Sequence, residues 1–261
     1  MRVTDWSALA AAEGPPQASA LSIGAFDGIH RGHQELIRRI TAKNAEFIST
    51  IVTFRKNPKE FLGKKDFKGD ILSLDQKLAI FERLSVARVV LIDFSENFSK
   101  LSGKEFFGLV RDRLNPGFVV LGSNFRCGYR GATDSARSKA LYHGAGIPVE
   151  IVPPVLEAGR PISSSRIRIA IAAGNFSAAA QLLGRNVEFD LSPVAGERRE
   201  DDSFYRTAPL RRIMPRPGSY PALLHGGGKA DTVKAVVVIS KDGVLVPRLG
   251  EREAPCRIEF I

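Results

Sequence analysis

Apolar, β-branched runs alternate with helical patterns from residue 18 to residue 183. The run 86–94 is nearly continuous in apolar residues, which is typical of a strand buried on both faces. Strands that alternate with helices form βαβ units, so the pattern predicts an α/β fold with a parallel sheet and helices on both of its faces. The predicted strands are 18–23, 47–54, 86–94, 118–121 and 149–152.

The beginnings of three helices can be recognised between these strands. One helix opens near His33 and places apolar residues three and four positions apart. Ser73 is followed three residues later by Gln76, and Ser102 is followed by Glu105. Both pairs have the capping-box pattern, in which each side chain bonds to the other residue's backbone N–H, so helices are predicted to start at Ser73 and Ser102.

The pattern changes after Gly184. The segment 193–206 is polar and charged, which predicts a linker or mobile loop. Short apolar runs follow, and Asp242-Gly243 between two of them is a hairpin signal. The sequence therefore predicts two domains, an α/β domain over 1–185 and a small β-barrel-like domain over 186–261. The predicted strands of the second domain are 220–224, 233–239, 244–246 and 256–260.

The strongest candidate for chemistry is the segment 24–33, which follows the first predicted strand and opens the first predicted helix. Its glycines let the backbone approach a ligand closely, and a helix N-terminus presents free N–H groups to an anion. His30 and His33 lie three residues apart across this turn, so both imidazoles can face the same phosphate. The segment has neither the P-loop nor the G-x-G-x-x-G pattern. A metal site is the weaker interpretation, because no third ligand stands at a suitable spacing from the two histidines.

A second helix start, at Ser163 or Ser164, has a similar character. Either hydroxyl can cap a helix that Gly174 ends, and the guanidinium of Arg166 or Arg168 can add charge at its N-terminus. Taken alone, this is an ordinary capped surface helix with exposed arginines. Beside the histidine segment, a second phosphate site is the favoured interpretation.

The bulk composition changes this picture little. The chain has 261 residues, of which 44% are hydrophobic and 25% charged, as in a soluble globular protein. We expect no secretory leader and no membrane span, because no basic start precedes an apolar run and no long apolar window exists. Cys127 and Cys256 are the only cysteines, which argues against a disulfide framework or zinc site and fits a reducing cytoplasm.

The net charge of +10 allows several partners. Nucleic acid needs Lys and Arg for its phosphates, but the basic residues form only short clusters, such as Lys64-Lys65, without interleaved aromatic residues. Anionic small molecules would also gain from a positive field, and a basic surface kept for solubility is equally compatible. Charge alone therefore decides nothing, and the expectation of small-molecule substrates, with no nucleic acid and no membrane partner, comes from the motifs.

Four motifs together resemble a known family. The segment 24–33 resembles the H-x-G-H signature of the nucleotidylyltransferase superfamily. With Phe26-Asp27-Gly28 in front, it looks like the bacterial FAD synthetase family, whose members are usually bifunctional riboflavin kinase/FMN adenylyltransferases. The resemblance covers residues 21–185. The other motifs are 53–61, similar to T-F-x-P-H-P-x-E, 120–128, similar to G-x-D/N-F-x-F-G, and 162–168, similar to S-S-T-R-I-R.

The resemblance implies a Rossmann-like nucleotidylyltransferase domain that converts ATP and FMN to FAD and pyrophosphate, with Mg²⁺ bridging phosphates and no metal ligands from the protein. The residues implied to bind ATP are Gly24, Ala25, Phe26, Asp27, His30, Gly32, His33, Ser163, Ser164, Ser165 and Arg166, and His30, His33 and Arg166 are implied to be catalytic. The residues implied to bind FMN are Phe54, Asn57, Phe61, Asn124, Arg126 and Arg168.

The chain departs from the family pattern in two regions. Arg55-Lys56-Asn57 stands where an acidic residue, proline and histidine are common, and Cys127 replaces an aromatic residue. The region after Arg185 contains no G-x-P-T-A-N segment, so a shortened riboflavin kinase-like domain without kinase activity is expected. The alternatives are a nucleotidylyltransferase for another phosphate compound, a bifunctional riboflavin kinase/FAD synthetase, and a non-catalytic flavin or nucleotide binder. A class I aminoacyl-tRNA synthetase is disfavoured, because no K-M-S-K-S-like segment is present.

Overall fold

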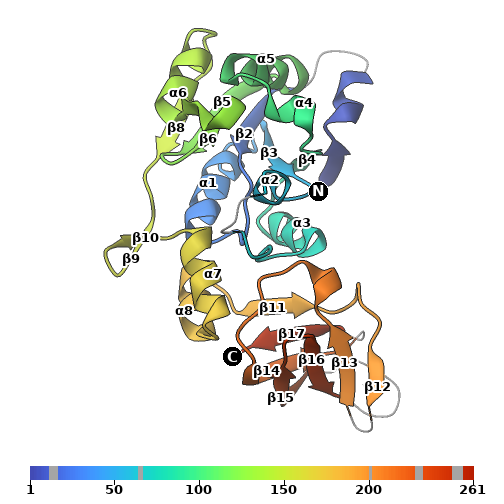
Figure 1. Cartoon of the computed structure of the whole chain (residues 1–261). Helices are drawn as coiled ribbons and strands as arrows, with labels where there is room; N and C mark the ends of the chain where they lie inside the picture. Colours follow the sequence, from blue (N-terminus) through green and yellow to red (C-terminus); the bar gives the residue numbers. More distant parts are fainter. Residues whose placement is uncertain (12–16, 64–66, 200–201, 227–231, 249–254) are drawn as a thin grey trace. The chain divides into compact units, whose positions relative to one another are not determined.

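A computed structural model describes residues 1–11, 17–63, 67–199, 202–226, 232–248 and 255–261 of the chain (Figure 1). The chain forms two compact units, one made of Met1–Phe67 with Leu78–Pro161 and the other of Lys68–Lys77 with Ile162–Ile261. The basic cluster Lys64-Lys65 and the acidic pair Glu200-Asp201 lie outside the described residues.

The first unit contains the predicted parallel sheet, whose six strands lie in the order β1-β4-β3-β2-β5-β8. Every neighbouring pair is parallel, which confirms the α/β prediction. β1 has no counterpart among the predicted strands, because it is a four-residue edge strand with little apolar character. The strands are β1 (Arg2–Asp5), β2 (Ser19–Ile23), β3 (Ile48–Phe54), β4 (Arg88–Ile92), β5 (Pro116–Gly122) and β8 (Val149–Val152).

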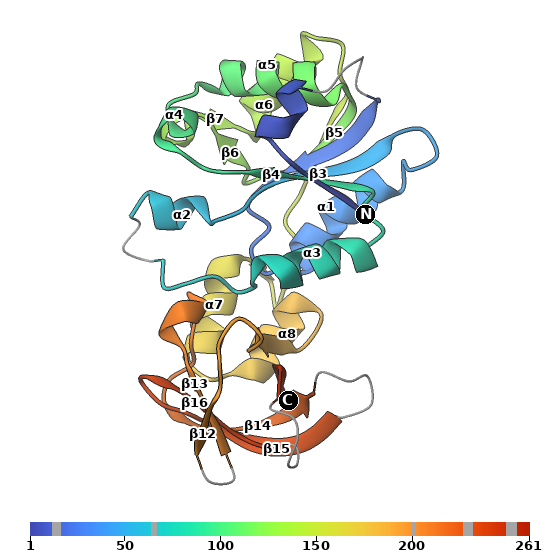
Figure 2. The same ribbon diagram turned by 90° about the vertical axis from the view of Figure 1, so that its right-hand side faces the viewer.

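Helices cover both faces of this sheet (Figure 2). On one face, Phe106, Phe107 and Tyr142 of α5 and α6 pack on strand residues such as Leu21 and Val119. Leu36, Ile37 and Ile40 form the buried side of α1, which lies against β2, β3 and β5 on the other face. The helices are η1 (Ser7–Ala11), α1 (Arg31–Thr41), α2 (Pro58–Phe61), α3 (Leu74–Arg83), α4 (Glu96–Ser99), α5 (Gly103–Leu114), η2 (Tyr129–Gly131) and α6 (Ser135–His143). Two small hairpins complete the unit, β6 (Arg126–Cys127) with β7 (Thr133–Asp134) and β9 (Leu156–Glu157) with β10 (Arg160–Pro161).

Both predicted capping boxes are present. Ser102 Oγ accepts from the backbone N–H of Glu105, whose carboxylate accepts from the backbone N–H of Ser102. Ser73 and Gln76 form the same reciprocal pair at the start of α3. These starts were predictable because a capping box depends only on residues within one turn of the helix.

The second unit carries an open, antiparallel sheet in the order β11-β17-β14-β15-β16-β13-β12. The prediction of a linker over 193–206 was wrong, because this segment contributes the strands β12 and β13. Ser203, Phe204 and Tyr205 of β13 are buried, whereas the charged residues of β12 are exposed at the sheet edge, where charge discourages further pairing. The elements are α7 (Ser164–Ala172), α8 (Phe176–Leu183), β11 (Val187–Asp190), β12 (Glu197–Arg199), β13 (Asp202–Arg206), η3 (Ala208–Leu210), β14 (Gly218–His225), β15 (Thr232–Ile239), β16 (Gly243–Pro247) and β17 (Arg257–Phe260).

The helices α7 and α8 belong to the same compact unit as this sheet. Phe176 at the start of α8 stacks on Phe260 with ring centroids 3.9 Å apart. Gly174, just beyond the C-cap of α7, has φ 71°, and a Cβ there would lie only 2.6 Å from the hydroxyl of Tyr220. The second compact unit thus begins after Pro161, whereas the expected domain boundary lies after Arg185. Across the ranges that the structure describes, no helix is long and apolar enough to cross a membrane.

Candidate active site

The loop between β2 and α1 is held in a strained backbone conformation. Phe26 and Ile29 have φ values of 49° and 36°, in the left-handed region that residues with bulky side chains avoid. Both side chains are fully buried, and the Phe26 ring packs edge-on against Phe81. Burial therefore imposes the backbone shape of the loop, and such imposed strain is often found where a protein positions functional groups.

This loop brings His30 and His33 together. Their rings are stacked, with centroids 3.7 Å apart and an interplanar angle of 15°. His30 is the N-cap of α1, because its Nδ1 accepts from the backbone N–H of His33 at 3.3 Å. A Cβ on Gly32 would lie 3.2 Å from the His30 ring, so glycine at this position leaves room for the imidazole.

Asp27 and Asn57 connect this loop to the end of β3. Asp27 is only 4% exposed, and its Oδ2 lies 3.4 Å from Nδ2 of Asn57. Asn57 also caps α2, where its Oδ1 accepts from the backbone N–H of Lys59. Thr53 adds a bond to the carbonyl of Ala25 at 3.1 Å. The structure thus places Asn57, predicted for FMN, in contacts that fix the two loops relative to each other.

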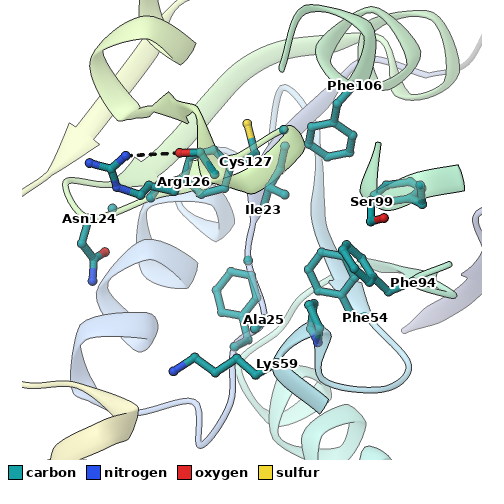
Figure 3. Close-up of a pocket in the computed structure, with 18 of the residues that line it drawn as sticks. Ile23, Ala25, Phe54, Lys59, Phe94, Ser99, Phe106, Asn124, Arg126 and Cys127 are labelled. Atoms are coloured by element: carbon teal, nitrogen blue, oxygen red, sulfur yellow. Dashed lines mark hydrogen bonds between the residues drawn. The ribbon is translucent and has the colours of Figure 1, made fainter. Parts of the chain in front are cut away.

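A cavity of about 510 Å³ opens beside the loop, at the carboxyl ends of β2, β3 and β5 (Figure 3). Ligands bind at this edge in open α/β sheets. His33 lines the cavity, whereas His30 reaches it only through its ring, which stacks on that of His33. The other predicted site residues that line it are Gly24, Ala25, Phe26, Phe54, Asn124 and Arg126.

Much of the cavity wall is aromatic and was missed from the sequence. Phe94, Phe98, Phe106 and Phe125 line it beside Phe54. Phe61, predicted for FMN, is instead 51% exposed, and its ring meets Phe94 at 5.5 Å. Phe94 ends the predicted strand 86–94, and a position at the carboxyl end of a parallel strand was the signal that could have identified it.

The charged residues of the altered motif point to different places. Arg55 forms ion pairs with Asp5 and with Asp93, the latter at 3.2 Å. Lys56 is exposed, whereas Lys59 lines the cavity. Arg126 also lines the cavity, and it donates through Nη1 to the carbonyl of Gly131 at 3.2 Å. The departure from the family motif therefore adds charge mainly outside the cavity.

Cys127 replaces an aromatic residue and also lines the cavity. Burial raises the pKa of its thiol to about 12, and a hydrogen bond with Ser138 opposes the shift in part. The thiolate is the reactive form, so at pH 8 its population is roughly a thousandfold below that of an ordinary thiol. We expect one slowly alkylated thiol per native chain, with a rate that still rises with pH at pH 10. Alkylation in denaturant gives the two-thiol reference, and equal, fast reaction of both native thiols would contradict the burial of Cys127.

The second candidate phosphate segment lies in the other compact unit. Ser163 is the N-cap of α7 and accepts from the backbone N–H of Arg166 at 3.3 Å. Ser165 is exposed, and Ser164 and Arg166 are partly so. Arg168 is buried and donates through Nε to the carbonyl of Gly69 at 2.9 Å, which holds the segment 68–70 against α7. A shared role of this segment and the histidine pair stays a prediction.

Over the described ranges of the chain, no group of three or more His, Cys, Asp or Glu side chains is placed to hold a metal ion.

The parallel sheet, the strained loop after β2 and the cavity at the strand ends define a Rossmann-like α/β protein with a ligand site at the carboxyl edge of its sheet. The model of the FAD synthetase family matches residues 13–166, and the chain belongs to this family.

Individual relatives agree with this assignment. The chain is 28% identical over 203 residues to the bifunctional riboflavin kinase/FMN adenylyltransferase of Buchnera aphidicola subsp. Schizaphis graminum, covering 76% of this chain and 65% of the relative. It is 32% identical over 193 residues to the protein of the same name from Buchnera aphidicola subsp. Acyrthosiphon pisum, covering 73% of this chain and 62% of the relative. The chain therefore spans less than two-thirds of the length of these two relatives.

A solved structure shows the same fold along the whole chain. The crystal structure of a macrolide-efflux protein from Streptococcus pneumoniae superposes with a TM-score of 0.82 at 25% identity, covering 100% of this chain and 90% of that one.

Proposed function

We propose that this chain is an FMN adenylyltransferase, which joins the AMP part of ATP to the phosphate of FMN and releases pyrophosphate. The observation that carries the proposal is the aromatic cavity lined by His33 of the stacked pair His30–His33. An isoalloxazine ring suits such aromatic walls, and imidazole N–H groups suit phosphate oxygens. Membership of the FAD synthetase family supports the same reaction.

In the proposed reaction, a phosphate oxygen of FMN attacks the α-phosphorus of ATP and the bond to the β-phosphate oxygen breaks. The FMN phosphate is anionic near neutral pH, so the nucleophile needs no general base. Catalysis then rests on positioning and on stabilising charge at the α-phosphate. We propose that His30 and His33 donate hydrogen bonds there and that Ser164, Ser165 and Arg166 hold the departing pyrophosphate.

The contacts of His30 support its role as a donor. Since its Nδ1 accepts from the backbone N–H of His33, the proton of the neutral ring lies on Nε2. The N-cap bond therefore fixes both the tautomer and the orientation of the ring. We propose that this Nε2–H donates to a phosphate oxygen of ATP.

Mg²⁺ fits this site as a companion of ATP. Protein sites usually bind it through one or two carboxylates together with substrate phosphates and waters. Because the described residues contain no three-ligand cluster, we infer that the ion is carried mainly by the phosphates of ATP, whose negative charge it neutralises.

The proposed domains are an adenylyltransferase domain over 1–185 and a truncated riboflavin kinase-like domain over 186–261. We infer that the second has no kinase activity, because the sequence after Arg185 lacks a G-x-P-T-A-N segment. We also place the enzyme in the cytoplasm, where both cysteines would stay reduced, with small molecules rather than nucleic acid or membranes as its partners.

One assay with two arms tests this function. The purified chain is incubated with Mg-ATP and either FMN or riboflavin, and the flavins are separated by chromatography. We expect FAD and pyrophosphate in equal amounts from FMN, and no FMN from riboflavin. If FMN yields no FAD at any enzyme concentration, the adenylyltransferase proposal is wrong. If riboflavin is phosphorylated, the proposal that the second domain lacks kinase activity is wrong.

A further inference from the structure

The cavity has two chemically different parts. One is apolar, formed by Ile23 and the rings of Phe54, Phe94, Phe98 and Phe106. The other part carries the polar residues Lys59, His33, Asn124 and Arg126. In Figure 3 the amine of Lys59 is turned away from the rings of Phe54 and Phe94, toward the side where Asn124 is drawn. A ligand with one apolar end and one charged end matches this division.

The charge of the cavity has one sign. Lys59 and Arg126 supply positive groups, and among the described residues that line the cavity none is acidic. Other basic side chains of the same loop do not add to it, since Arg55 is paired with Asp5 and Asp93 and Lys56 is exposed. The cavity is thus suited to an anion, and a phosphate at one end of a flavin is such an anion.

The backbone of Lys59 is firmly held. Its N–H donates to Oδ1 of Asn57, the N-cap of α2, and Asn57 also reaches Asp27 in the loop that carries the histidine pair. Lys59 is half-buried and lines the cavity, so its apolar stem can lie along the wall. These contacts fix the position of Lys59 relative to His33.

We propose that Lys59 binds the phosphate of FMN and thereby selects FMN over riboflavin. The inference rests on the proposed function, because it assigns the cavity to the flavin. The ring enters the aromatic part, and the phosphate lies between Lys59 and His33, next to the position proposed for the α-phosphate of ATP. Lys59 is thus a residue that determines specificity and orients the nucleophile.

Direct binding tests this without turnover. FMN and riboflavin are titrated separately, in the absence of ATP, against the wild-type chain and its Lys59→Met variant, with quenching of flavin fluorescence as the signal. Methionine keeps an unbranched stem but removes the charge. We expect FMN affinity to fall by about tenfold to a hundredfold, the usual range for losing one charge-assisted hydrogen bond, and riboflavin affinity to change less than about twofold.

Two further variants complete the design. Lys56→Met removes an equal charge from an exposed position of the same loop and is expected to leave both affinities unchanged. Lys59→Arg keeps the charge and should restore most of the preference for FMN. The difference between wild type and Lys59→Met should shrink with added salt.

The possible failures are distinguishable. If Lys59→Met weakens FMN and riboflavin equally, or changes neither, the phosphate role of Lys59 is wrong even when the wild-type chain makes FAD. If the wild-type chain makes no FAD but prefers FMN and loses that preference in Lys59→Met, the phosphate site stands and the adenylyltransferase proposal falls.

Discussion

Replacing His33 by alanine is expected to lower kcat for FAD formation by about a hundredfold or more, as the loss of a donor to developing charge does in other enzymes. The reason is its location, since His33 both lines the cavity and stacks on His30. In the proposed reaction, removing the His33 ring takes away one hydrogen-bond donor to the α-phosphate and leaves the His30 ring without its stacking partner. Steady-state kinetics with FMN and Mg-ATP measure the effect.

His30 needs a more careful substitution, because its ring also caps α1. His30→Ala removes both the cap and the proposed phosphate donor, and loss of a cap costs about 1 kcal/mol of stability. His30→Asn offers a side-chain oxygen to the same backbone N–H, and asparagine is among the preferred N-cap residues. We expect His30→Asn to keep the stability of the wild type and still lose about a hundredfold in kcat.

The matched control for both positions is His143→Ala. His143 is an exposed histidine in the last turn of α6 and is not among the residues that line the cavity. Its loss should leave kcat within about twofold of the wild type. Full activity in His33→Ala and His30→Asn, with each variant folded by circular dichroism, would refute the catalytic role of the pair.

Replacing Arg212 by alanine is expected to destabilise the second compact unit by about 3 kcal/mol or more, because it removes three hydrogen bonds that a buried guanidinium makes. Arg212 is 6% exposed, and its guanidinium donates to Gln76 Oε1 at 2.6 Å, to the carbonyl of Glu188 at 2.8 Å and to the carbonyl of Ile71. It also lies over the ring of Phe189 at 4.8 Å. Arg212 therefore links the segment 68–77 to β11, beside the bond that Gln76 Nε2 donates to the carbonyl of Glu188.

Equilibrium unfolding in urea, followed by far-UV circular dichroism, measures the loss. For a protein of this size, 3 kcal/mol corresponds to a midpoint lowered by about 1 M. Arg212→Lys should recover only part of the lost stability, because an ammonium group cannot reproduce the planar arrangement of N–H donors of a guanidinium. Arg216→Ala, at an exposed position of the same unit, is the control. A midpoint for Arg212→Ala within about 0.2 M of the wild type would show that this network contributes little.

The features that could be predicted from the sequence are those that depend on residues close together in the chain. The parallel sheet followed from apolar runs, and the capping boxes at Ser73 and Ser102 followed from residues within one helical turn. The turn that brings His30 and His33 together was predictable for the same reason. In the second unit, the turn at Asp242-Gly243 joins β15 to β16 as expected.

What the sequence did not show depends on contacts between distant segments. Phe98 and Phe106 line the cavity because α4 and α5 fold over the strand ends, and no local pattern indicates that. β13 was hidden because its buried residues follow closely on the exposed, charged residues of the edge strand β12. The buried position of Arg168, on the carbonyl of Gly69, likewise arises from two segments far apart in the sequence.

The most direct test of the account follows the phosphorus atoms of ATP. The chain is incubated with FMN and Mg-ATP labelled with ³²P at either the α or the γ position, and the products are separated. Transfer of AMP predicts that the α label appears in FAD and the γ label in pyrophosphate. Absence of the α label from every flavin product, or transfer of the γ label to a flavin, would contradict the proposed reaction.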